Sequence, residues 1–175
     1  MSFLAERDMA RRALEYRGPG PAPDFPPVAS RIRAARERLG VSVQDFAARW
    51  SEEPSTYWDL ELTDDALFRT VALGEIPRLA SALELPVMVL LFGEVPMRAV
   101  AQVSYRDVAG AIDRQLSHDG LTVEQLSAAV GWELQPILDE PDVLSGLNLS
   151  AVLNICQAVR LDWVGLLQAV ALGAA

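Results

Sequence analysis

The side chains that most often perform catalysis or bind metals are few in this sequence and far apart. His118 is the only histidine and Cys156 the only cysteine, which argues against a disulfide and a cysteine-built zinc site. Cys156 is expected to be a small core residue. The acidic pairs Glu52-Glu53 and Asp64-Asp65 are adjacent, and neighbouring helical residues point about 100° apart, so neither pair forms an acid–base dyad by itself. We therefore predict no enzyme activity, no cofactor and no metal.

The composition predicts an acidic protein with enough apolar residues for one large domain or two small ones. Of the 175 residues, 51% are hydrophobic, 24 are acidic and 15 are basic, which gives a net charge of −9. The N-terminus has no long apolar run, and the longest uncharged stretch, Val143 to Val159, is short and contains Ser, Asn and Gln. We expect a cytoplasmic protein without a membrane segment. The negative charge repels polyphosphates at long range.

After residue 27 the chain repeats itself. The segment from Val28 to Trp50 matches the segment from Val108 to Val130 at an offset of 80, and Ile76 to Leu85 matches Val152 to Leu161 at an offset of 76. The second copy is therefore four residues shorter in one loop. These matches predict three parts: residues 1–27, 28–96 and 97–175.

Short helices are expected throughout. Ser42 and Thr122 each precede an apolar pattern of helical period and are expected to be N-caps, with Gly40 and Gly120 ending the helices before them. The segment "VMVLLF" is predicted to be a helix because its counterpart is "WVGLLQAV". Trp50, Trp132 and Trp163 are most simply core residues.

A separate helical arm is expected before the repeats. Residues 2–17 have an amphipathic helical pattern, and residues 18–27, "GPGPAPDFPP", form a stiff Pro/Gly-rich linker. The arm is expected to dock either on the body of the protein or on a partner.

The motifs "RIRAARERLGVSVQDFA", "EPSTYWDLE" and "IPRLASALELPVMVLL" in residues 28–92 resemble the lambda-repressor-like, or Xre-type, helix-turn-helix family. Residues 107–170 resemble it more loosely. The resemblance implies an all-α fold of two tandem five-helix units, preceded by the arm. In such domains the third helix enters the DNA major groove. The resemblance would make residues 53–61 that helix, with Pro54, Ser55 and Asp59 facing the bases and Tyr57 and Leu60 facing the core.

Three departures from the family pattern argue against DNA binding. Val43 and Val123 stand where the family often has a glutamine near a phosphate. Asp59 and Asp139 stand where a groove-facing helix usually presents an amide or a base, and a carboxylate meets phosphate repulsion there. The turn after the third helix, residues 62–65, carries two aspartates where the family is usually basic.

Charge leads to the same conclusion. Residues 41–96 hold ten acidic residues and three arginines, and residues 107–167 hold nine and two, so each has a net charge of −7. DNA affinity depends largely on phosphate neutralisation by Lys and Arg. One basic cluster exists on the first helix of the first copy, and two interpretations of it stay open. It is either a solvated helix with internal salt bridges, which we favour, or a patch for phosphate or an acidic partner. Its members are Arg31, Arg33, Arg36 and Arg38.

The third helices are instead predicted to carry a protein-binding face. If Tyr57 and Leu60 point inward, Trp58 points outward, and an exposed Trp beside acidic residues is typical of a protein-binding patch. The alternative is that the other copy or the arm covers Trp58. The predicted face comprises Ser55, Trp58, Asp59, Leu62, Leu134, Gln135, Leu138 and Asp139.

The functional hypothesis is a non-enzymatic regulatory or adaptor protein that reuses a degenerate helix-turn-helix scaffold to bind a protein. The partner would be a basic protein or a second copy of the chain. The alternative is an Xre-type DNA-binding transcription regulator, which the charge disfavours.

Overall fold

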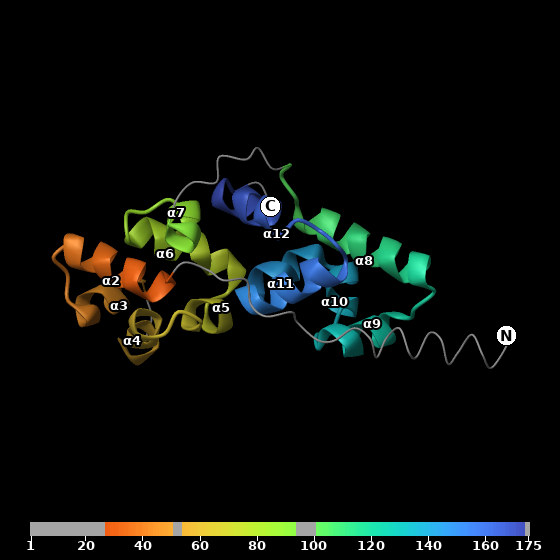
Figure 1. Cartoon of the computed structure of the whole chain (residues 1–175), viewed down its shortest axis with the longest axis horizontal. Coiled ribbons are helices and arrows are strands. Elements are labelled where there is room, and N and C mark those ends of the chain that lie inside the picture. The colour runs from red at the N-terminus through yellow and green to blue at the C-terminus, as the bar shows by residue number, and fades with distance from the viewer. Residues whose placement is uncertain (1–26, 51–53, 94–100, 174–175) are drawn as a thin grey trace.

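The computed structural model describes residues 27–50, 54–93 and 101–173, and the regular elements in these residues are all helices (Figure 1). The described chain thus has the predicted all-α class. Among the described residues, the one β-bridge is isolated and joins Ala72 to Asn148. The predicted arm at residues 2–17 lies outside the described residues.

The first half of the described chain forms one continuous series of short helices. The segment "VMVLLF" is the last of them, which confirms that it is a helix and not a strand. The elements are α2 (Val28–Arg38), α3 (Val43–Trp50), α4 (Pro54–Leu62), α5 (Ala66–Thr70), the 3-10 helix η1 (Leu73–Glu75), α6 (Ile76–Ala82) and α7 (Val87–Phe92).

The second half follows the same order with two differences: a 3-10 helix stands where the first half has α5, and α11 alone covers the positions of η1 and α6. Two prolines explain the first difference: Pro136 lies in the first turn of α10, and Pro141 cannot continue that helix. The elements are α8 (Tyr105–Asp119), α9 (Val123–Val130), α10 (Gln135–Asp139), η2 (Pro141–Gly146), α11 (Leu149–Ala158) and α12 (Trp163–Ala171).

The predicted helix boundaries around the first corner of each half are confirmed. Gly40 and Gly120 have φ values of 67° and 64°, which glycine adopts without steric cost. The Ser42 hydroxyl accepts a hydrogen bond from the N–H of Asp45 at 3.1 Å. Thr122 forms a full capping box with Gln125, whose side chain accepts from the Thr122 N–H at 2.9 Å. These caps fix where α3 and α9 begin.

A continuous apolar core runs through both halves. In the first half, α2 contacts α4 and α7, and α3 contacts α4 and α6; in the second, α8 contacts α10 and η2, and α11 contacts α9 and α12. Cys156 on α11 is fully buried in this core, as predicted. Core residues with 1% or less exposure include Ile32, Phe46, Leu79, Leu90, Val108, Ile112, Ile155 and Leu166.

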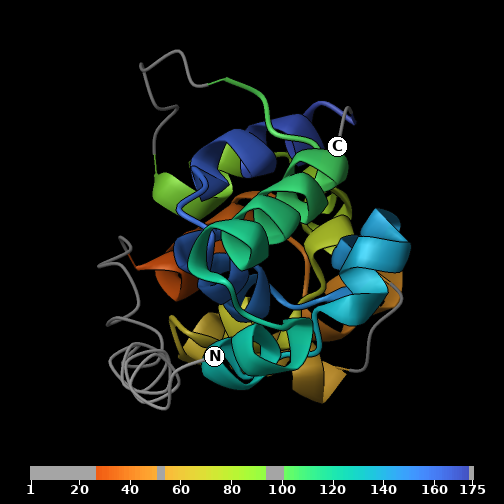
Figure 2. The same ribbon diagram turned by 90° about the vertical axis from the view of Figure 1, so that its right-hand side faces the viewer.

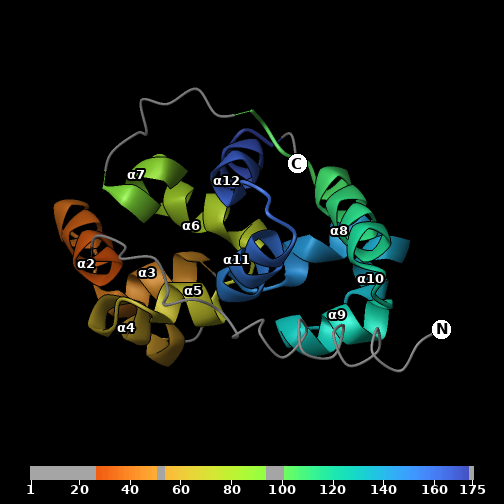
Figure 3. The same ribbon diagram turned by 45° about the vertical axis from the view of Figure 1, so that its right-hand side comes forward.

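The two halves pack against each other through several pairs of elements, of which α7 and α12 are counterparts in the sequence repeat. α7 contacts α12, α5 contacts α11, and η1 contacts η2 (Figures 1 and 3). The bridge joins Ala72 to Asn148, which are 76 residues apart and so stand at matching positions of the sequence repeat. Contact between a residue and its own counterpart is what a two-fold relation produces. Nearby, the Leu73 N–H donates to the Leu147 carbonyl at 2.8 Å.

The helices that do not take part in this junction lie at the two ends of the molecule. α2, α3 and α4 form one end, and α8, α9 and α10 form the other, which faces the viewer in Figure 2. α4 and α9 both lie along the lower side in Figures 1 and 3. The two helices are therefore separate from each other and lie along the same side of the ribbon in these views.

Candidate functional site

α4 divides sharply into a buried face and an exposed face. Tyr57 and Leu60 are buried and Trp58 is 52% exposed, as the helical period predicted. Leu62, one helical turn after Trp58, is 54% exposed. Ser55 and Asp59 are exposed as well. Four of the residues predicted to form a partner face thus come together on one surface, which we call the α4 face: Ser55, Trp58, Asp59 and Leu62.

An ion pair anchors the inner side of α4. Nε and Nη2 of Arg36 donate to the two carboxylate oxygens of Glu61 at 2.6 and 2.9 Å. Burial opposes ionisation of Glu61, but the hydrogen bonds from Arg36, the closeness of the Tyr57 hydroxyl and the charges of Arg36 and Arg33 outweigh it and lower the pKa of Glu61. The carboxylate is therefore ionised at neutral pH and ties α4 to α2.

Aromatic packing completes this anchor. The Tyr57 ring lies 4.7 Å from the Phe46 ring and 6.4 Å from the Trp50 ring, centroid to centroid. The Tyr57 hydroxyl is buried beside Glu61 without a hydrogen bond of regular geometry. Burial, with the adjacent Glu61 carboxylate, raises the pKa of Tyr57 far above its usual range. Trp58 and Leu62 thus project from a helix whose other side is held by an ion pair and by ring contacts.

The four arginines of α2 bind internal acceptors. Arg31 donates to the carbonyls of Leu90 and Leu91 at 2.8 and 2.7 Å, and Arg38 donates to the carbonyl of Leu83 at 3.1 Å. These carbonyls end α7 and α6, where a cation is favourable.

The other two arginines of α2 serve α4. Arg33 donates to the backbone carbonyl of Glu61 at 2.7 Å, and Arg36 binds the Glu61 carboxylate and also the carbonyl of Val41 at 2.9 Å. Arg36 is only 13% exposed. The internal-contact interpretation of this basic cluster fits the structure, because each of the four guanidinium groups has an acceptor within the fold.

Two features that departed from the DNA-binding pattern have structural roles. Val43 is buried at the start of α3, in the core cluster. The Asp64 carboxylate accepts a hydrogen bond from the N–H of Ala29 at 3.0 Å and so caps the first turn of α2 from a distant loop. Asp65 pairs with Arg69 at 3.0 Å on the surface. The sequence pattern gave no signal of the Asp64 contact because its partner is 35 residues away.

The second half does not form a matching apolar face. Leu134 was predicted to be exposed, and this was wrong: its side chain is fully buried. Because α10 starts only at Gln135, Leu134 lies in the turn before it, where its N–H donates to the Ser127 hydroxyl at 3.0 Å. Leu138 is partly buried against the core. Gln135 and Asp139 are exposed and hydrogen-bonded to each other at 2.8 Å, so this surface is polar.

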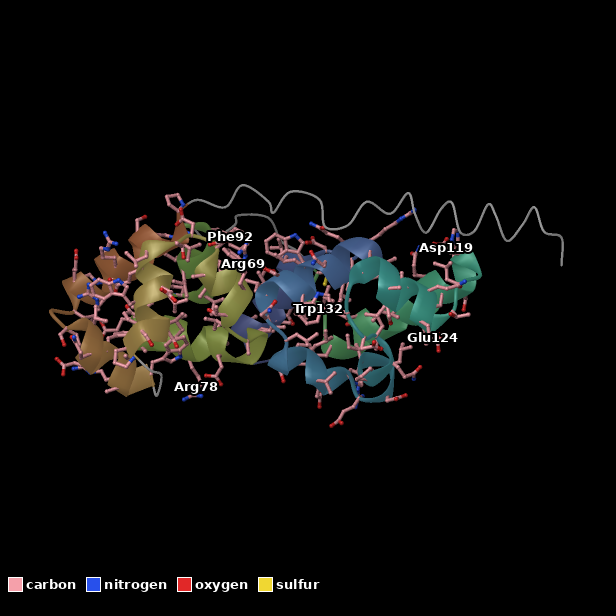
Figure 4. The ribbon with its side chains drawn as sticks, turned by 90° about the horizontal axis from the view of Figure 1, so that it is seen from below. Arg69, Arg78, Phe92, Asp119, Glu124 and Trp132 are labelled. Carbon is pink, nitrogen blue, oxygen red and sulfur yellow. The ribbon has the colours of Figure 1, made fainter. Side chains whose placement is uncertain are left out.

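A groove runs along one face of α9, from Glu124 in its first turn to Trp132 and Glu133 just beyond its end. It has a volume of about 450 Å³ and is lined by one aromatic ring, two acidic residues and three small residues. Trp132, predicted to be a core residue, is only partly buried and forms part of the lining. Figure 4 shows Trp132 and Glu124 on this half of the molecule. The lining residues are Glu124, Ser127, Ala128, Gly131, Trp132 and Glu133.

The residues first considered for chemistry are not assembled into a reactive site. His118 is exposed and contacts its neighbour Asp119 at 2.7 Å. Burial raises the pKa of the Cys156 thiol to about 12, so this thiol is protonated at neutral pH. Among the described residues, no group of three or more His, Cys, Asp and Glu side chains could hold a metal ion. Of the described helices, none is both long and apolar enough to cross a bilayer.

Comparison with known proteins gives no relative from which a role could be transferred. No family model matches the chain, and neither a curated protein nor a solved structure matches it. The resemblance to the lambda-repressor-like family stays a prediction from sequence. The features that bear on the function of this chain are therefore those of the α4 face and its surroundings.

Proposed function

We propose that this chain is a non-enzymatic regulatory or adaptor protein that binds another protein through the α4 face. The observation that carries the proposal is the exposure of Trp58 and Leu62, one turn apart on a helix whose opposite side is fully packed. Exposed large apolar side chains that adjoin each other mark interaction surfaces, and Trp is the residue most enriched in binding hot spots. Within the described residues, about half of the surface of each of these two side chains stays exposed.

The charge around this face supports a basic partner. Asp59 is exposed on α4, and residues 62–65 after it add two aspartates, of which Asp64 accepts the Ala29 N–H and Asp65 pairs with the exposed Arg69. The arginines nearest to α4 in the fold, Arg33 and Arg36, are occupied by Glu61. A basic protein surface would therefore meet an apolar centre with an acidic rim, as electrostatic complementarity favours.

The test uses the intact chain carrying a photo-cross-linking residue in place of Trp58 or, as a control, in place of Ser81, which is exposed on α6. A partner that cross-links from position 58 and not from position 81 would be purified and its affinity measured. Trp58→Ala is expected to weaken that affinity by about thirtyfold, as for a central Trp hot spot. Unchanged affinity, with the urea-unfolding midpoint also unchanged, would refute the proposal.

One observation favours the alternative, an Xre-type DNA-binding regulator. The contact of Ala72 with Asn148 relates the two halves as the protomers of a two-fold dimer are related, and dimeric repressors place two reading helices on successive half-sites. Against it stand the net charges and the polar, five-residue α10. A band shift with the chain's own upstream DNA, weakening steeply as salt rises, would favour the regulator over the adaptor.

A further inference from the structure

We propose that the groove along α9 binds an arginine side chain of a basic protein segment. The proposal deepens the proposed function and rests on it in one respect: both assign a basic protein partner to this chain. The groove is nevertheless a separate surface, in the second half of the chain, and can be tested alone. Trp132 would be its floor, and Glu124 and Glu133 its charged rim.

The composition of the groove matches a guanidinium group. Ala128 and Gly131 are small and exposed, which leaves the space beside the Trp132 ring open. An indole face attracts a cation, and a planar guanidinium can stack on it while its N–H groups point to the sides. Glu124 and Glu133 are the first and last of the lining residues in the sequence. Both side chains are exposed, and their carboxylates accept such N–H groups.

The charge of the surrounding chain is one-sided. Between Arg114 and Arg160 there are six acidic residues and no Lys or Arg. Among the described residues, neither Glu124 nor Glu133 forms a salt bridge. A cation in the groove would therefore meet two carboxylates that no internal cation neutralises, which distinguishes them from Glu61 and Glu75, paired with arginines.

The occupant is assigned to a protein segment because an aromatic floor with a carboxylate rim needs a flat cation on an apolar stem. Arginine has this form, since its methylene groups can lie along Ala128 while its charge reaches the rim. The same features exclude polyphosphates, which the carboxylates repel. The groove complements the α4 face. The α4 face presents apolar side chains to the partner, and the groove would bind a charged side chain of the partner.

The test measures binding of an N-acetylated hexa-arginine peptide to the full chain by NMR, following the indole N–H signal of Trp132, assigned with Trp132→Phe. The peptide is expected to shift this signal, and the citrulline version of the peptide, which has the same shape without charge, is expected not to. Glu124→Gln with Glu133→Gln should weaken binding by about tenfold. Ala128→Arg, which places a cation in the groove from an exposed helix position, should weaken it similarly.

The matched control is Glu140→Gln with Asp142→Asn, which removes the same charge from exposed positions outside the groove. It should leave binding within about twofold of the natural chain, since screening limits distant charges. Equal weakening by both double variants, or a Trp132 signal that does not move, would overturn the proposal. This result would not affect the α4 face, whose test depends on position 58 and on no added peptide.

The proposal assigns the groove to a segment of a different protein. Either of two other occupants would overturn that assignment. If the Trp132 signal moved with protein concentration in the absence of peptide, a second copy of the chain would occupy the groove. If Arg11→Ala with Arg12→Ala moved it at every concentration, the N-terminal segment would occupy it. A signal insensitive to both supports a separate partner.

Discussion

Arg36 and Glu61 form an ion pair inside the first half, while the corresponding positions of the second half are Leu116 and Pro141. Leu116 packs against the core. The two halves thus carry opposite chemistry at these matching positions: an ion pair between α2 and α4 in the first half, and two apolar residues, on α8 and η2, in the second. The difference has a measurable energetic consequence.

Breaking the pair from one side should cost far more than replacing both partners. Glu61→Leu leaves Arg36 as an uncompensated, largely buried charge, and Arg36→Met does the same to Glu61; each should lower the free energy of unfolding by about 3–5 kcal/mol. The double variant, which imitates the apolar second half, should recover most of this loss. Urea unfolding of the four proteins forms a double-mutant cycle, and additive losses would contradict this account.

The same pair predicts how stability changes with pH. The folded-state pKa of Glu61 is below its ordinary value of 4.5, because the contacts with Arg36, Tyr57 and Arg33 outweigh desolvation. The unfolded chain then binds the proton more tightly, so this stabilisation is fully present above about pH 4.5 and is lost as the pH falls through the folded pKa. Urea midpoints of the natural chain and Glu61→Gln should differ at neutral pH and converge as the pH falls below 4.5. A constant difference would contradict the assignment.

The junction between the halves should be sensitive at Gly74. A Cβ added there would lie 3.2 Å from the carbonyl oxygen of Ser145 and 3.3 Å from its Cβ, so η1 and η2 would have to separate slightly. Gly74→Ala is expected to cost about 1 kcal/mol of unfolding free energy, as overpacking typically does. Gly146→Ala, on η2 with no atom within 4 Å of the added Cβ, is the control and should be neutral in thermal unfolding. Equal effects would show that the close approach is unimportant.

Two non-glycine residues at matching positions have a left-handed backbone conformation that destabilises the folded state. Replacing either residue by glycine should remove this cost. Glu84 and Arg160, 76 residues apart, follow α6 and α11 with φ values of 53° and 55°. Glycine tolerates this left-handed conformation, so Glu84→Gly and Arg160→Gly should each raise the free energy of unfolding by about 0.5–1 kcal/mol. Ser81→Gly, within α6, should instead lower it by about 1 kcal/mol. Loss of stability in the first two variants would contradict the strain argument.

Much of the first half could be predicted from the sequence, because its helical period and its helix caps depend on residues that are close together in the chain. The helical period placed Tyr57 and Leu60 inside and Trp58 outside, and the positions of Ser42 and Gly40 set the corner before α3. Such signals lie within one or two helical turns, so they are visible in the chain itself. The α4 face could therefore be proposed before its surroundings were known.

What could not be predicted depends on contacts distant in sequence. Leu134 was misplaced because a shift of one residue in where α10 begins turns a side chain from the surface to the core. The acceptors of Arg31, at the end of α7, are about sixty residues away. Periodicity contains no information on such pairings. The groove is a different case, since its lining lies within residues 124–133, and it was missed because Trp132 was predicted to be a core residue.

The contact of Ala72 with Asn148 joins two halves of a single polypeptide. An assembly of two separate identical chains would dissociate on dilution and would display every surface twice. Here the covalent connection keeps the halves together at any concentration, and the described residues carry the exposed Trp58 on α4 and the acidic groove on α9 in a fixed ratio of one to one. A target could be held at two unlike points at once, with no need for a second molecule to arrive.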